Sequence, residues 1–140
     1  MERDEIEEKL AQTKTLFMVQ NTPRVDLLLK QIKLLDRFLK QGHSLVSGPC
    51  LLYELDNEIC CKGFTDKIIV GRGMECELPL LKPGLSRMHF QLEVGPQGNT
   101  VSDLDSKNGT KVNDTEIKSQ VLVPGDVINA GDVLFIYLED

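Results

Sequence analysis

The pattern of apolar and polar positions changes at about residue 43 of this 140-residue chain. Before that point, apolar residues recur every three or four positions, the spacing that places them on one side of an α-helix. After it, short apolar runs alternate with turn residues such as Pro-Gly and Asn-Gly pairs, which is typical of β-strands. We therefore predict a helical appendage over residues 1–42 and a mostly β domain over residues 43–140.

The appendage is predicted to be a hairpin of two helices. The first spans residues 2 to about 20, and the second runs from Pro23 to about Gln41, where Gly42 supplies a stop. The apolar residues of the second helix form a heptad seam that two further residues widen: Val25, Leu28, Ile32, Leu35 and Leu39, with Leu29 and Phe38.

A helix with such a seam must bury it, and two interpretations stay open. The hairpin packs on itself or on the β domain, or residues 1–42 form a coiled-coil homodimer. Two and a half heptads are too few to decide on their own. The first helix offers chiefly Ile6, Leu10 and Phe17, too little to cover the seam, so the rest must meet the β domain or a second copy. Of these two we predict the homodimer.

About ten short strands at this spacing predict an antiparallel β-sandwich. In the run after Arg87, apolar Met88, Phe90, Leu92 and Val94 alternate with polar residues, so we expect these four to face the core. The last run, 133–138, is apolar throughout and is predicted to be a central strand buried on both faces.

Three polar clusters stand at the ends of apolar runs in the β domain. Together they would place a guanidinium, a hydroxyl, an amide and backbone N–H groups on three loops of one rigid scaffold. Such a set of donors suits an anion. The clusters are Gly71 and Arg72; Ser86, Arg87, Met88 and His89; and Ser106, Lys107, Asn108, Gly109 and Thr110, with Asn113 just beyond.

The order and spacing of these clusters resemble the forkhead-associated (FHA) domain, a phosphothreonine-binding β-sandwich. The family pattern runs Gly-Arg, Ser-Arg-x-His, Ser-x-Asn-Gly-Thr and then an Asn three residues further on. All four parts are present in order within about forty residues, and the resemblance covers about Cys50 to Leu138. It implies a module that binds a phosphothreonine-containing protein.

The resemblance also implies a role for each matching residue. One group would bind the phosphate: Arg72, Ser86, Arg87 and Lys107. A second would contact the peptide backbone: Asn108 and Asn113. A third would support the site structurally: Gly71, His89, Gly109 and Thr110. Asn108 and Gly109 are, in addition, the commonest two-residue signal for a hairpin turn.

Charge narrows the choice of partner. The net charge of −6 conceals an acidic β domain, because residues 43–140 carry eight Lys and Arg against fifteen Asp and Glu. Such a domain is a poor nucleic-acid binder, since duplex affinity needs many phosphate contacts. Half of its basic residues nevertheless fall in or beside the three clusters: Arg72, Arg87, Lys107 and Lys111.

No apolar run approaches the roughly 20 residues that a membrane helix needs. The acidic N-terminal stretch is unlike a signal peptide, so we expect an intracellular, cytoplasmic protein without a membrane partner.

We expect no catalytic residue, cofactor or metal site. Ser86 and His89 would project to opposite faces of a strand, and the chain has no Gly-x-Ser-x-Gly elbow. The four cysteines form no Cys-x-x-Cys pair. The sequence therefore predicts a non-enzymatic module for phosphothreonine peptides. The alternative is an assembly module that uses the sandwich and helices as a scaffold without phosphate.

Overall fold

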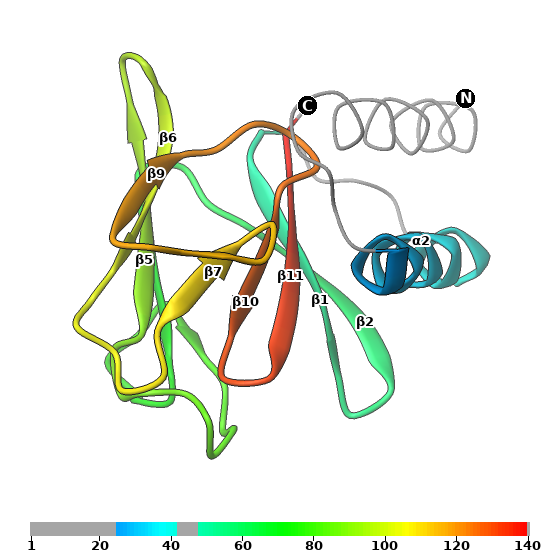
Figure 1. Ribbon diagram of the computed structural model, residues 1–140, viewed down its shortest axis with the longest axis horizontal. Coiled ribbons are helices and arrows are strands. Elements are labelled where there is room, and N and C mark those ends of the chain that lie inside the picture. Colours follow the sequence, from blue (N-terminus) through cyan, green and yellow to red (C-terminus); the bar gives the residue numbers. More distant parts are fainter. Residues whose placement is uncertain (1–24, 42–47, 140) are drawn as a thin grey trace.

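The structure, a computed structural model, describes residues 25–41 and 48–139 (Figure 1). The described part begins with the helix α2 (Val25–Lys40) and continues with strands only. The first predicted helix lies outside the described residues, so the helical hairpin stays a prediction. The strands are β1 (Cys50–Leu55), β2 (Glu58–Gly63), β3 (Lys67–Gly71), β4 (Leu78–Pro79), β5 (Phe90–Gly95), β6 (Gly98–Asp103), β7 (Thr110–Val112), β8 (Thr115–Ile117), β9 (Ser119–Val121), β10 (Val127–Ala130) and β11 (Val133–Leu138).

The strands form two sheets that share one apolar core. One sheet has the order β2-β1-β11-β10-β7-β8, and the other has the order β4-β3-β5-β6-β9. Side chains from both sheets meet between them: the rings of Phe90 on β5 and Phe135 on β11 pack edge to face with centroids 5.3 Å apart. The short pair β3–β4 is parallel, and the other strand pairs of the described residues are antiparallel. The predicted mostly β, two-sheet architecture is confirmed.

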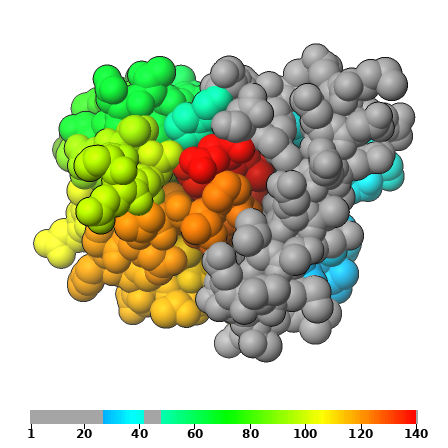
Figure 2. Space-filling view, turned by 90° about the horizontal axis from the view of Figure 1, so that it is seen from above, coloured from blue at the N-terminus to red at the C-terminus, as the bar shows by residue number. Residues whose placement is uncertain are grey.

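Strand β11 lies between β1 and β10 and is buried on both faces, as its apolar sequence predicts. Because side chains alternate along a strand, Phe135 and Tyr137 face the core between the sheets, and Ile136 and Leu138 face the other way. Viewed from above, the end of β11 lies in red beside the orange segment that leads into β10 (Figure 2). Backbone hydrogen bonds join β11 to this segment, among them one from Gly125 N to the Tyr137 carbonyl at 2.7 Å.

Helix α2 covers the outer face of β11 and its neighbours (Figure 1). Its buried residues follow the spacing of one helix face and pack on Leu52, Ile59 and Ile136 of the six-stranded sheet. These buried helix residues are Leu27, Gln31, Leu34, Leu35 and Phe38.

This buried face differs from the predicted heptad seam. Leu35 and Phe38 belong to both, but Leu28, Ile32 and Leu39 are only half-buried, and Leu29 is 49% exposed. The helix therefore buries its deepest side chains on its own sandwich, and the structure gives a homodimer through this helix no support. The buried face has the polar Gln31 at its centre, so the spacing of apolar residues did not predict it.

Three hairpins close with two-residue turns in which both residues have positive φ. Asp56 and Asn57 join β1 to β2 with φ of 51° and 67°, and Asn113 and Asp114 join β7 to β8 with 49° and 72°. The third turn, Gly131 and Asp132, joins β10 to β11. These are the signs of type I′ turns, which match the twist of paired strands.

The prediction of a hairpin turn at Asn108 and Gly109 is wrong. Of the two, only Gly109 has a positive φ, 82°, and the flanking strands β6 and β7 belong to different sheets. The pair instead lies in a loop that crosses from one sheet to the other.

The inward alternation predicted for residues 88–94 is wrong at its two ends. Strand β5 begins at Phe90, whereas Met88 and Val94 are both 41% exposed. His89, expected on the polar face, is fully buried.

Candidate functional site

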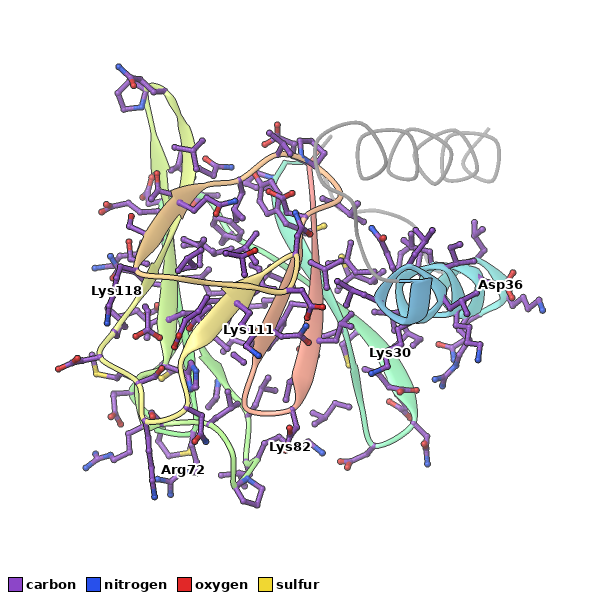
Figure 3. All side chains as sticks on the ribbon, viewed as in Figure 1. Lys30, Asp36, Arg72, Lys82, Lys111 and Lys118 are labelled. Atoms are coloured by element: carbon purple, nitrogen blue, oxygen red, sulfur yellow. The ribbon has the colours of Figure 1, made fainter. Side chains whose placement is uncertain are left out.

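Three loops meet at the end of the sandwich where β3 finishes. They are residues 72–77, residues 80–89 and residues 104–109. The first two are joined by backbone hydrogen bonds from Arg72 N to the Ser86 carbonyl and from Gly73 N to the Arg87 carbonyl, both 2.9 Å. Figure 3 shows Arg72 at this end, at the bottom of the sandwich. The structure thus brings the three polar clusters of the sequence together.

Arg72 extends from this junction into solvent. Its Nε donates to the Leu85 carbonyl at 3.1 Å, which fixes the base of the guanidinium. Within the described part of the chain, its two terminal nitrogens have no hydrogen-bond partner, so the planar fork is available. The preceding residue must be glycine, because a Cβ at Gly71 would collide with the Arg87 carbonyl.

Ser86 connects the second loop to the third. Its Oγ accepts a hydrogen bond from Lys107 N at 2.9 Å. A hydroxyl has one donor and two acceptor positions, so accepting this bond leaves the Ser86 O–H free to donate. Because the Arg72 amide is bonded to the Ser86 carbonyl, the guanidinium and the hydroxyl belong to adjoining backbone segments.

His89 links the second and third loops from inside. Its Nδ1 accepts from Ser86 N at 3.0 Å, and its Nε2 lies 2.8 Å from the Gly109 carbonyl. A backbone N–H can only donate, so Nδ1 is the acceptor and the ring hydrogen sits on Nε2, where it donates to Gly109. With both nitrogens occupied and no exposure, His89 holds the loops in place and has no access to a ligand.

Asp103 organises the third loop, a role that the sequence did not suggest. Its carboxylate accepts bonds from the Ser106 hydroxyl at 2.6 Å, the Thr110 hydroxyl at 2.7 Å and Ser106 N at 3.1 Å. The Ser106 Oγ also accepts from Gly109 N at 2.9 Å. Burial raises the pKa of Asp103, but these hydrogen bonds outweigh it and leave the pKa below its ordinary value. An Asp three residues before a Ser, at the end of a strand, is the signal that could have found it.

The two asparagines expected to contact a peptide lie in different surroundings. Asn108 is exposed, and its Nδ2 donates to the Gly84 carbonyl at 2.9 Å. Asn113 is buried in the β7–β8 turn, where its Nδ2 donates to Asp126 and its Oδ1 accepts from Val127 N, both at 2.9 Å. The amide of Asn113 is therefore used inside the fold, and the peptide contact expected from the sequence stays a prediction.

The remaining charged residues of the site are exposed. Arg87 forms an ion pair with Glu75 at 3.3 Å, in which its side chain is 75% exposed. Lys107 contributes its backbone N–H to Ser86, while its side chain extends into solvent. Gly109 has a positive φ, and Thr110 is buried on Asp103, so both shape the loop and are not free to hold a ligand.

The arrangement suits the binding of an anion at a protein surface. Residues 25–41 and 48–139 contain no group of three or more His, Cys, Asp and Glu side chains placed to hold a metal ion. Over the same residues, no helix has both the length and the apolar character to cross a membrane.

Comparison with known proteins identifies the fold. Residues 68–131 match the model of the FHA domain family, a segment that contains all three loops. The crystal structure of the FhaA FHA domain, complexed with the intracellular domain of Rv3910, is 30% identical with a TM-score of 0.59. It aligns with 64% of this chain over 98% of its own length. The chain contains an FHA domain. The resemblance seen in the sequence is thereby confirmed.

Two further relatives support the same assignment. The FHA domain-containing protein FhaA of Mycobacterium tuberculosis is 38% identical over 63 residues, which are 45% of this chain and 12% of that protein. A structure from an analysis of phosphothreonine-dependent FHA domain interactions is 27% identical, with a TM-score of 0.60, and covers 67% of this chain and 98% of that one. The chain therefore spans a small part of the full-length relative and nearly all of the isolated FHA domains.

Proposed function

We propose that this FHA domain binds phosphothreonine-containing peptides and so mediates phosphorylation-dependent protein–protein interaction. The observation that carries the proposal is the guanidinium fork of Arg72, which has no partner among the described residues, beside the Ser86 O–H on a loop hydrogen-bonded to its own. FHA domains are interaction modules rather than enzymes, and the proposal involves no chemical step.

The chemistry of the ligand matches these donors. Phosphothreonine carries about −1.5 to −2 charges at neutral pH and three strong acceptor oxygens. The Arg72 fork can donate two parallel bonds to such oxygens, and the Ser86 hydroxyl can donate a third. Lys107 adds a positive charge without fixed geometry. Because these groups lie at the surface, the phosphate would not lose all its hydration, which keeps the cost of binding a dianion low.

Asn108 is the residue that we propose holds the peptide main chain. Its Nδ2 uses one hydrogen on the Gly84 carbonyl, so the second hydrogen and the Oδ1 remain for a ligand among the described residues. An amide offers both a donor and an acceptor, which are the groups that a peptide backbone requires. Asn113 is left out of this proposal because its amide is committed to Asp126 and Val127.

Arg87 is proposed as a secondary contributor. Its guanidinium is paired with Glu75 in a contact that is exposed on both sides, and such pairs contribute little to stability. A phosphate could therefore replace Glu75 as its partner at small cost. Substitution of Arg87 should weaken binding less than substitution of Arg72.

An assembly module that does not use phosphate is the alternative function. It would need an apolar surface for a partner, and the face of α2 best suited to that role is buried on the sandwich. Such a module also would not require the donors at Arg72 and Ser86 that lack partners among the described residues. The structure therefore favours phosphopeptide binding.

Fluorescence polarisation can test the proposal. The probe is a labelled peptide library with phosphothreonine fixed and the flanking positions varied, measured beside the same library with unphosphorylated threonine. We expect binding of the phosphorylated peptides alone. Equal binding of both libraries would overturn the proposal and support the assembly module.

A further inference from the structure

A groove runs between α2 and the end of the sandwich that carries the site. Its volume is about 880 Å³. One wall is α2, and the other combines the β1–β2 turn, the segment around Lys82 and the start of β11. Its basic lining residues are Lys30, Lys33, Arg37 and Lys82, and its acidic lining residues are Glu54, Asp56 and Asp132.

The unpaired charge in this groove is positive. Arg37 and Glu54 neutralise each other in an ion pair, and Arg37 also donates to the Asn57 carbonyl at 2.8 Å. Lys30, Lys33 and Lys82 have no ion-pair partner in the part of the chain that the structure describes.

The two remaining carboxylates, Asp56 and Asp132, stand at the tips of two hairpin turns. Three ammonium groups, two of them on α2, against two carboxylates make a basic surface beside an acidic β domain. Figure 3 shows Lys30 beneath α2 and Lys82 below the β10–β11 turn.

The groove is continuous with the proposed phosphopeptide site. Gly84 lines the groove, and its carbonyl accepts the bond from the Asn108 amide. Gly84 also packs directly on Gly131, because a Cβ at Gly84 would lie 2.9 Å from the Gly131 Cα. A peptide held at Arg72 and Asn108 can therefore pass over Gly84 and enter the groove without leaving the protein surface.

We propose that the phosphorylated partner carries an acidic segment that binds in this groove, next to the segment that carries its phosphothreonine. The inference rests on the proposed function, since the phosphothreonine supplies the first attachment. Helix α2 lies outside the segment that matches the FHA family, so this second surface is separate from the matched domain. Two linked attachments raise affinity because the second becomes intramolecular.

Three peptides test the inference by fluorescence polarisation. The first is a short phosphothreonine peptide that binds well in the library above. The second extends it on either side, through a Gly-Ser spacer, with a run of Glu, and the third extends it with a run of Gln. We expect the Glu extension on one side to tighten binding about tenfold, from three lysine contacts of modest strength. The Gln extension should add nothing, and added salt should remove the gain.

Charge reversal on α2 locates the effect. In Lys30→Glu/Lys33→Glu, both changes are at exposed positions, so the fold should persist, and the gain from the Glu extension should disappear. The control, Lys40→Glu/Lys118→Glu, changes the net charge by the same amount at exposed residues outside the groove and should keep the gain. Short-peptide affinity should stay the same in both variants.

Each other outcome counts against the inference. A Glu extension that adds no affinity, or a gain that both variants reduce equally, would overturn it while short-peptide binding leaves the proposed function intact. Failure of every phosphothreonine peptide to bind would overturn the proposed function itself, and the groove would lose its acidic partner with it.

Discussion

The loop that joins β6 to β7 and the turn that joins β7 to β8 are three residues of strand apart, and each contains an asparagine beside an aspartate network. Asp103 holds the loop by accepting hydrogen bonds from the Ser106 and Thr110 hydroxyls. Asn108 stays exposed, and its Nδ2 uses one hydrogen, on the Gly84 carbonyl. In the turn, Asn113 donates to the buried Asp126, which directly precedes β10. Under the proposed function, the same residue types would serve ligand binding in one region and stability in the other.

In this protein, the asparagine that keeps free hydrogen-bonding capacity is the one whose loop is held by other groups. At residues 104–109, the Asp103 carboxylate and the Ser106 hydroxyl accept the loop's hydrogen bonds, so the loop does not need the Asn108 side chain to hold its shape. At the β7–β8 turn, Asn113 alone among the described residues bonds both the Asp126 side chain and Val127 N. Substitutions in the two regions should therefore affect different measurements.

The largest expected effect is on folding, from Asn113→Gly. Glycine tolerates the positive φ of this position, so the change removes the amide without adding backbone strain. It leaves a buried Asp126 oxygen and the buried Val127 N–H without partners, which should lower the free energy of unfolding by about 2–4 kcal/mol. Urea denaturation measures the loss. Phosphopeptide affinity of the folded protein should not change, and a fall in affinity with unchanged stability would contradict the role given to Asn113.

The opposite result is expected from Arg72→Ala. Removal of the guanidinium should weaken phosphopeptide binding by about 1.5–3 kcal/mol, the range for a hydrogen bond to a charged group. The melting temperature should stay nearly the same, because the side chain makes one bond to a carbonyl at the surface. Titration by fluorescence polarisation provides the affinity, with Ser86→Ala expected to cost less. An Arg72→Ala protein that binds as well as wild type would remove Arg72 from the site.

Asn108→Ala should weaken peptide binding by about 0.5–1.5 kcal/mol, the net contribution of an ordinary hydrogen bond. The effect on unfolding should be small, since the bond to Gly84 is exposed. Asn108→Ala and Asn113→Gly form a direct pair for comparison. Should both lower stability without changing affinity, the distinction between the two regions would be wrong.

The pH dependence of stability separates the two aspartates. Hydrogen bonds hold the pKa of Asp103 below its ordinary value of 3.8, so it stabilises the fold above that pH and loses this contribution as the pH falls through its folded pKa. Burial raises the pKa of Asp126 despite its hydrogen bonds, so its ionised form costs stability near neutral pH, and protonation relieves the cost.

Denaturation of wild type, Asp103→Asn and Asp126→Asn from about pH 7 to about pH 3 measures both contributions. Relative to wild type, the destabilisation by Asp103→Asn should shrink as the pH falls, and that by Asp126→Asn should grow. Slopes of the same sign in the two variants would show that one assignment is wrong.

Much of the fold could be predicted because its signals are local. The fully apolar run that became β11 predicted a central strand, and the spacing of three polar clusters predicted loops that meet at one end. The buried face of α2 could not be found in this way. Its centre is Gln31, whose Nε2 is satisfied by the Gly125 carbonyl 94 residues away, a contact that no periodicity reveals.

The details of the site were harder to predict than its location. The sequence gives residue types, but the availability of a side chain depends on contacts made across the fold. Arg87 pairs with Glu75, and Asn113 is used by Asp126, so residues that match the family pattern differ in what they can offer a ligand. Asp103 lies outside the family motif, so the motif does not point to it. Its carboxylate nevertheless accepts hydrogen bonds from Ser106 and Thr110, which lie inside the motif.

The position of α2 has a practical consequence for protein production. A recombinant protein that starts at the expected boundary near residue 43 would lack the helix and expose the outer face of the six-stranded sheet. That face is lined by Leu52, Ile59, Ile136 and Leu138, which are almost completely shielded in the intact chain. A contiguous hydrophobic patch of this kind promotes aggregation during expression and purification. Shortened versions intended for crystallisation or screening should therefore keep residues 25–41.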